Sequence, residues 1–173
     1  MSKAFLKGIL VFTCALITYT THAQRKYEQM GIIFKIPKDW KITDETPEKN
    51  AYSFSCEKEG EMESGVVTFA YIGRDLDMNA FLALCMQNAE NSANQSDGKN
   101  FAWGADTADV KVGDFMAKQV TYNVDFLGLP FSNKILIFKA CGNMVMLNTT
   151  EATEDHAKNE KGFDIIMNSL SCK

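Results

Sequence analysis

Two neighbouring stretches of apolar and polar residues limit the possible folds of this chain more than any other feature. Residues 51–58 (AYSFSCEK) alternate, so that Tyr52, Phe54 and Cys56 fall on one face of a strand, and residues 66–72 (VVTFAYI) form a second run rich in β-branched and aromatic side chains. A short charged connection separates the two runs, which predicts an antiparallel hairpin. The apolar face of such a sheet has to be covered, so a layered fold is expected.

Further strands and two helices are predicted from the rest of the chain. Strand patterns lie before the hairpin at 32–36 and 40–42, and after it at 109–112, 116–126, 131–140 and 144–149. Helical spacing of apolar residues predicts one helix at 78–91, capped by Asp77, and another from Thr153 or Glu154 to about Leu170. The polar stretch at 24–29 is expected to be a frayed end, and those at 43–50 and 91–100 are expected to be loops.

The order of these elements lacks the strand–helix–strand alternation that builds parallel sheets. Gly142-Asn143, between two strand patterns, predicts a two-residue hairpin turn. Residues 135–138 are apolar on both faces, as expected for a central strand that is covered on both sides. We therefore expect an α+β fold, with a mostly antiparallel sheet of about six to eight strands covered by two main helices in an α/β/α sandwich.

The composition fits one globular domain. The chain has 173 residues, of which 46% are hydrophobic and 23% charged. Its formal net charge is −4, which does not favour nucleic acid or an anionic membrane as a partner.

The first 23 residues have the layout of a cleavable signal peptide. Lys3 and Lys7 form a positive start, an apolar run follows at 8–19, and Ala23 supplies the small residue before a cleavage site. The apolar run is shorter than the roughly 20 residues that a membrane-spanning helix needs. We therefore expect a signal peptide at 1–23, a single domain at 24–173, and a secreted or periplasmic protein without a transmembrane segment after cleavage.

An oxidising compartment would allow the cysteines outside this leader to form disulfides. Cys172 follows the terminal helix, which should return over the last strand towards the turn beside Cys141, so this pair is expected to bond. Cys56 and Cys85 could form a second disulfide, but Cys85 lies in the middle of the first helix. Two buried free thiols are the alternative for this second pair.

The start and end of the domain resemble the superfamily that contains the photosystem II extrinsic protein PsbP, the Mog-type Ran-binding factor and DcrB-related envelope proteins. The residues that carry the resemblance are Gly31 with Phe34-x-Ile36-Pro37-x-x-Trp40 and the closing Phe163-x-x-Ile166-x-x-Ser169-Leu170. The resemblance implies a PsbP-like fold and a role in non-enzymatic binding or assembly. No partner-binding residue of that superfamily maps onto this chain.

No motif for catalysis, for a cofactor or for a metal is present. The chain lacks the nucleophile-elbow, phosphate-loop and dinucleotide motifs, and it has no paired Cys or His spacing typical of zinc sites. His156 lies in an acidic stretch that is expected to form a solvated first helical turn, where an imidazole lacks an orienting partner. We therefore expect a protein that is not an enzyme and that binds no cofactor.

Two features indicate a surface for a protein partner in the cell envelope. The connection at 125–131 carries Phe126, Leu127, Leu129 and Phe131, which is unusually apolar for a turn. It could meet a partner or tuck against the body of the protein. Trp103 could line a groove or belong to the core.

The leading hypothesis is a binding or assembly module that uses this apolar connection. The alternative is a small-molecule or lipid carrier with a pocket between the sheet and the first helix, lined by some of the chain's methionines.

Overall fold

The computed structural model describes residues 24–48, 51–60, 64–73, 76–105 and 107–173. The expected signal peptide at 1–23 lies outside these residues, as does part of the charged connection, at 61–63. Neither helix within the described ranges is long and apolar enough to cross a membrane.

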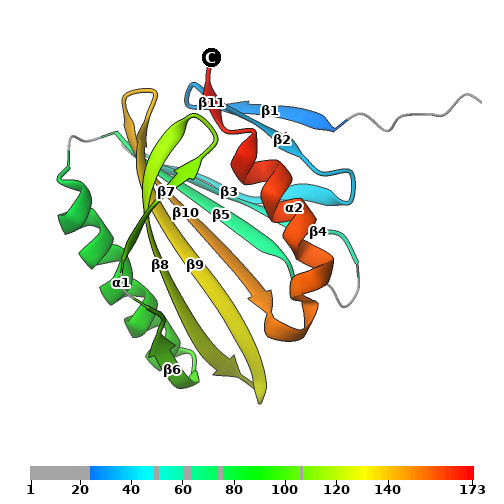
Figure 1. Ribbon diagram of the computed structural model, residues 1–173, viewed down its shortest axis with the longest axis vertical. Coiled ribbons are helices and arrows are strands. Elements are labelled where there is room, and N and C mark those ends of the chain that lie inside the picture. The colour runs from blue at the N-terminus through cyan, green and yellow to red at the C-terminus, as the bar shows by residue number, and fades with distance from the viewer. Residues whose placement is uncertain (1–23, 49–50, 61–63, 74–75, 106) are drawn as a thin grey trace, which may run out of the picture.

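The main element is an eight-stranded sheet (Figure 1). Its strands are β3 (Trp40–Glu48), β4 (Ala51–Lys58), β5 (Val66–Ile72), β6 (Lys99–Trp103), β7 (Ala108–Val112), β8 (Phe115–Phe126), β9 (Leu129–Ala140) and β10 (Asn143–Ala152). They lie in the order β3-β4-β5-β10-β9-β8-β6, and β7 pairs with β8. The strand pairs that the structure describes are all antiparallel, which confirms the α+β class.

A small second sheet and two helices complete the domain. The small sheet has the order β1-β2-β11, formed by β1 (Arg25–Gln29), β2 (Ile32–Ile36) and β11 (Ser171–Cys172). The helices are α1 (Met78–Gln95) and α2 (His156–Asn168), the latter preceded by a 3-10 turn at Thr153–Asp155. Figure 1 shows α1 in green and α2 in red on opposite sides of the large sheet. Asp77 caps α1 as expected, because its Oδ1 accepts a hydrogen bond from the Ala80 N–H at 2.9 Å.

The sheet separates two hydrophobic cores. The α2-side core joins the sheet to the small sheet and to α2, with stacked rings of Phe34, Phe54 and Phe69 at its centre. The α1-side core joins the other face to α1, through residues such as Phe81 and Ile137. Strand β9 contributes alternately to both cores, which confirms the expectation of a central strand.

The elements that the sequence pattern missed lie mainly at sheet edges. Residues 25–29 and 43–48 form strand where a frayed end and a loop were expected, and β6 begins at Lys99 within the second expected loop, at 91–100. Polar side chains are compatible with such strands because an edge strand has one side open to water. Helix α1 also continues four residues beyond the expected Asn91, which allows Ala93 to be buried.

The turn between β9 and β10 is centred one residue earlier than expected. Cys141 and Gly142 have the positive φ angles of 51° and 81°, whereas Asn143 already pairs with Ala140. A two-residue turn with positive φ at both positions favours glycine at the second, so Gly142 determines the register.

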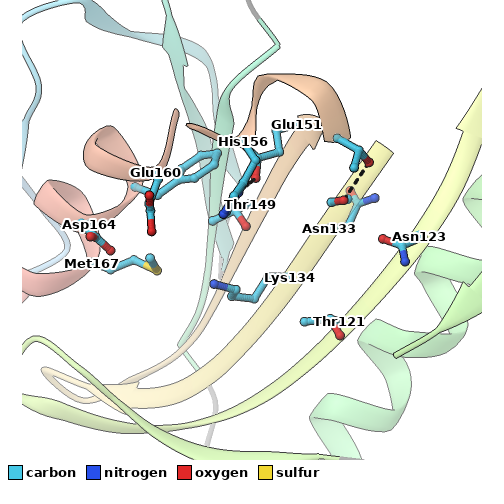
Figure 2. A pocket seen from close by; sticks show the side chains of 13 residues that line it. Thr121, Asn123, Asn133, Lys134, Thr149, Glu151, His156, Glu160, Asp164 and Met167 are labelled. Carbon is cyan, nitrogen blue, oxygen red and sulfur yellow. Dashed lines mark hydrogen bonds and ion pairs between the residues drawn. The ribbon is translucent and has the colours of Figure 1, made fainter. Parts of the chain in front are cut away.

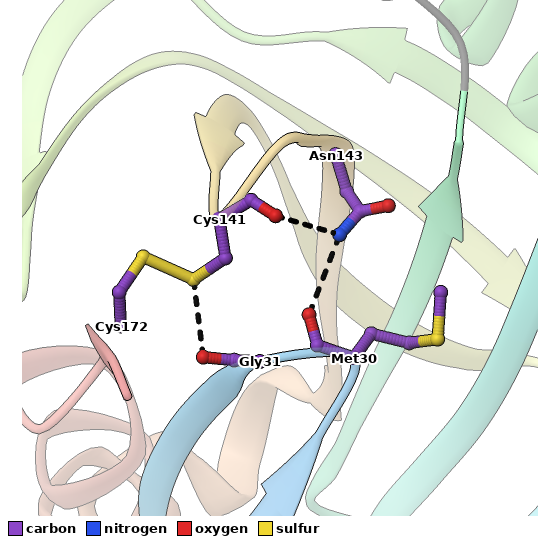
Figure 3. Close-up of a disulfide and its surroundings, with 5 residues drawn as sticks. All are labelled: Met30, Gly31, Cys141, Asn143 and Cys172. Carbon is purple, nitrogen blue, oxygen red and sulfur yellow. Dashed lines mark hydrogen bonds between the residues drawn. A yellow bond between two sulfur atoms is a disulfide. The ribbon is translucent and has the colours of Figure 1, made fainter.

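The expected disulfide between Cys141 and Cys172 is present, with a Cα–Cα distance of 5.7 Å (Figure 3). The second proposed bond does not form, and Cys56 and Cys85 are buried free thiols. The reason is topological, because Cys56 belongs to the α2-side core and Cys85 to the α1-side core, with the sheet between them. Burial raises the pKa of Cys56 to about 12 and that of Cys85 to about 11.

Candidate functional site

The apolar connection between β8 and β9 forms a hairpin turn, here called the hairpin tip (residues 126–131). Phe126 pairs with Leu129 at the end of the two strands, which leaves Leu127 and Gly128 as the turn residues. Their φ angles are 53° and 83°, so leucine occupies a left-handed conformation that it adopts rarely. Leu127 is fully exposed, and Leu129 is 52% exposed.

The two phenylalanines of the tip lie behind these leucines. The rings of Phe126 and Phe131 meet edge to face with centroids 5.9 Å apart, and both pack against the α1-side core. The tip is thus divided: its phenylalanines tuck against the body, while its leucines project.

Trp103 does not join the hairpin tip. It pairs with Tyr122 across β6 and β8, further along the strand from the turn. Its indole packs edge to face against Phe101 and Tyr122, with centroids 5.1 and 5.3 Å away. Trp103 is therefore a half-buried aromatic of the α1-side core.

A second candidate site is a cleft of about 620 Å³ between the sheet and α2, here called the α2 cleft (Figure 2). This volume falls within the range of about 300–1,000 Å³ that is typical of small-molecule sites. The lining residues come from three strands and the helical segment that follows them: Thr121, Asn123, Ser132, Asn133, Lys134, Thr149, Glu151, Thr153, His156, Glu160, Phe163, Asp164 and Met167.

The α2 cleft begins where the face of the sheet changes from apolar to polar. Along β10, Leu147 belongs to the α2-side core, and the next positions on that face are Thr149 and Glu151. Along β9, Leu136 is followed on the same face by Lys134 and then Ser132. The floor of the cleft is consequently built from hydroxyl and charged groups.

Glu151 is the most unusual residue of the cleft. It is a carboxylate only 6% exposed, and its Oε1 lies 2.7 Å from Nδ1 of His156. Its Oε2 is buried and has no hydrogen-bond partner in the described part of the chain. The hydrogen bond and charge of Glu151 raise the pKa of His156 above its usual value.

The sequence pattern did not reveal this pair. His156 is solvated as expected, with a 65% exposed side chain, but it does have an orienting partner. That partner lies on β10, before the 3-10 turn, so helical spacing could not indicate it.

A smaller cavity of about 300 Å³ lies between the sheet and α1, where the carrier hypothesis placed a pocket. It is lined by Cys85, Asn88, Ala89, Ser92, Tyr122, Ile135, Met146 and Asn148. A single methionine is among them, so the lining is not the methionine-rich surface that this hypothesis invoked.

No family model matches the chain, and no curated protein matches it. Solved structures do resemble it. The solution structure of cyanobacterial PsbP (CyanoP) from Synechocystis sp. PCC 6803 has a TM-score of 0.58 at 12% sequence identity, covering 90% of this chain and 96% of that one. A crystal structure from Bacteroides thetaiotaomicron VPI-5482 has a TM-score of 0.56 at 11% identity, covering 87% of this chain and 48% of that one.

This chain thus spans nearly all of the cyanobacterial protein and about half of the Bacteroides protein. At these identities the likeness concerns the fold alone. The chain has a PsbP-like fold, as the resemblance of its first strands and last helix implied.

Proposed function

We propose that this protein is a secreted or periplasmic binding module, without enzymatic activity, that docks a protein partner of the cell envelope through its hairpin tip. The observation that carries the proposal is Leu127, a fully exposed leucine in a left-handed conformation. A turn of this type favours asparagine or glycine at that position, so leucine is unfavourable for both the backbone and hydration.

A partner that covers the hairpin tip would remove the Leu127 side chain from water. Burying a leucine side chain completely contributes about 1.5–3 kcal/mol, and Leu129 adds further apolar surface beside it. The packed rings of Phe126 and Phe131 hold the turn against the body, which limits the ordering entropy lost on docking.

Two other features support export to an oxidising compartment and a non-enzymatic binding role. Disulfides such as Cys141–Cys172 persist mainly in oxidising compartments, which agrees with the signal-peptide pattern at 1–23. The superfamily that the chain resembles consists of non-enzymatic binding and assembly proteins, which agrees with docking as the function.

The test is site-specific photo-crosslinking in the host cell. A photoreactive phenylalanine analogue at position 127 should yield a discrete crosslinked protein band. The matched control is position 116, because Met116 is also an exposed apolar residue, at 62%, in the hairpin between β7 and β8.

The same band should disappear when Leu129→Asp is combined with the probe at 127. Crosslinks of equal yield from positions 116 and 127, or a band that persists with Leu129→Asp, would contradict docking through the hairpin tip.

A further inference from the structure

Acidic side chains outnumber basic ones in the lining of the α2 cleft. Three carboxylates line it, namely Glu151, Glu160 and Asp164, whereas the basic groups are Lys134 and His156. His156 carries a full charge only below its raised pKa. Carboxylates thus outnumber amines in the lining, and the excess of negative charge grows as the pH rises through the pKa of His156, which favours a cationic ligand.

Glu151 distinguishes this lining from an ordinary solvated acidic surface. Its carboxylate is withdrawn from water, one oxygen is bound by His156, and the other has no partner within the described residues. A buried carboxylate oxygen without a hydrogen-bond donor is unfavourable, so a donor that reaches Glu151 gains more than it would at the surface.

The remaining lining adds hydroxyl groups and an apolar wall. Thr121, Ser132 and Thr149 present hydroxyls from the floor, and Phe163 and Met167 contribute apolar surface from α2. Figure 2 shows the floor residues on the strands and Glu160, Asp164 and Met167 on the helix opposite. Hydroxyls and the Glu151 carboxylate on the floor, with the carboxylates of Glu160 and Asp164 on the helix opposite, suit a ligand that carries both hydroxyls and a positive charge.

We propose that the α2 cleft binds a small hydroxylated amine, whose ammonium group pairs with Glu151 and Glu160 while its hydroxyls bond the floor of the sheet. The imidazole of His156 can turn towards solvent because most of its side chain is exposed, which opens the carboxylate of Glu151 to the ammonium. Lys134 lies on the same floor, and its positive charge repels a cation bound there. This site lies on the opposite face of the sheet from the core that supports the hairpin tip, and it does not depend on docking at that tip.

Three linear polyols of nearly equal size test the sign of the ligand charge: D-glucamine as the cation, D-sorbitol as the neutral compound and D-gluconate as the anion. Each is titrated into the full-length protein at pH 7.5, followed by calorimetry and by backbone amide NMR shifts. D-glucamine should bind most tightly and should shift amides of Thr121, Thr149 and Met167.

Removing an acidic or a basic side chain from the cleft should change the affinity for D-glucamine in opposite directions, which locates the ammonium group. Glu160→Gln, on the exposed wall, should weaken D-glucamine binding about tenfold, corresponding to one lost charge pair in a partly buried site. Lys134→Gln should strengthen it several-fold, because the opposing charge is gone. Glu154→Gln is the matched control, since Glu154 is exposed on the preceding 3-10 turn and does not line the cleft.

Glu151→Gln should also weaken binding, and its fold is checked by circular dichroism because the residue is buried. Leu129→Asp should bind D-glucamine normally, which separates this site from the hairpin tip. The proposal is overturned by tighter binding of D-gluconate, by equal binding of D-sorbitol and D-glucamine, or by no cleft shifts with any of the three at tens of millimolar.

Discussion

At the scale of single residues, Leu127 occupies a backbone conformation that costs a leucine about 1 kcal/mol relative to residues that tolerate it. Asparagine tolerates this backbone conformation, and its polar side chain is well hydrated at an exposed turn. We expect Leu127→Asn to raise the free energy of unfolding by about 0.5–1 kcal/mol while it reduces partner crosslinking. Urea denaturation measures the first effect, and the photo-crosslinking assay, with the probe at 129, measures the second.

Leu129→Asn is the control for this change. Leu129 is half exposed but begins strand β9 without a positive φ, so its replacement relieves no backbone strain. Equal stabilisation by the two substitutions would show that the left-handed conformation is not the cause.

His156 predicts a pH dependence of stability at the start of α2. The pKa of His156 is raised mainly by the hydrogen bond and charge of Glu151. Partial burial lowers it, and the smaller effects of Glu160 and Lys134 oppose each other. Because the folded pKa exceeds the unfolded one, the pair stabilises the protein fully below pH about 6.5 and loses this contribution as the pH rises through the folded pKa.

We therefore expect His156→Gln to destabilise the protein at pH 5.5 and to have little effect at pH 9. The difference should stay below about 1 kcal/mol, because the imidazole is mostly exposed. Urea denaturation at the two pH values measures it, and NMR titration of the imidazole should give a pKa that falls in Glu151→Gln but not in Glu154→Gln. A larger loss at pH 9 than at pH 5.5 would contradict the assigned sign.

At the scale of elements, the hairpin between β7 and β8 depends on a close approach to the end of α2. Gly113 has a φ of 57°, and a Cβ added there would lie 2.0 Å from the carbonyl oxygen of Leu170. That oxygen also accepts a hydrogen bond from the Asp114 N–H at 3.0 Å. The residue after Val112 must therefore be glycine for two separate reasons.

Gly113→Ala should destabilise the protein by about 1–3 kcal/mol more than Gly128→Ala does. Gly128 is a matched control because its φ is also positive, at 83°, while its added Cβ meets nothing within 4 Å. Thermal or urea unfolding of both variants measures the difference. Equal destabilisation would show that backbone strain, and not contact with Leu170, determines the effect.

The elements also differ in how well the sequence predicts them. Strands such as β4 and β5 were predicted because one of their faces is buried, which enforces an alternation of residue types. Strands β1, β6 and the outer part of β3 lie at edges, where water permits polar residues on both faces. Strand β11 has two residues and exists only because it pairs with β2, a partner more than 130 positions away.

The two candidate sites also differ in how well the sequence predicts them. The hairpin tip was visible as an apolar turn, since it departs from a local rule about turns. The α2 cleft is assembled from β8, β9, β10 and the helix after them, and its polar residues have the pattern of ordinary solvated positions. Only the tertiary arrangement reveals that Glu151 is buried.

At the scale of the whole molecule, the two sheets meet where the turns of two hairpins face each other. Met30-Gly31 joins β1 to β2, Cys141-Gly142 joins β9 to β10, and the four residues have positive φ angles. Asn143 donates from Nδ2 to the Met30 carbonyl at 3.3 Å, as Figure 3 shows, and Cys141 Cβ lies 3.3 Å from where a Cβ of Gly31 would be. The C-terminus closes this contact, because Lys173 N–H donates to the Gly31 carbonyl at 2.9 Å.

The disulfide fixes this junction covalently, so its loss should affect the molecule as a whole. Cys141 and Cys172 lie 31 positions apart in the sequence, and the segment between them includes β10 and all of α2. Cross-linking a loop of this size stabilises a protein by about 2–4 kcal/mol, mainly by restricting the unfolded chain. The double variant Cys141→Ser, Cys172→Ser should lose stability of this magnitude in urea denaturation.

Reductant supplies the complementary measurement. It should lower the unfolding midpoint of the natural sequence to that of the double variant and leave the double variant unchanged. Cys56 and Cys85 cannot substitute for the lost bond, because the sheet separates them and their raised pKa values keep both thiols protonated. They should therefore be alkylated only after unfolding, and rapid alkylation of either thiol in the native protein would contradict the burial of that thiol.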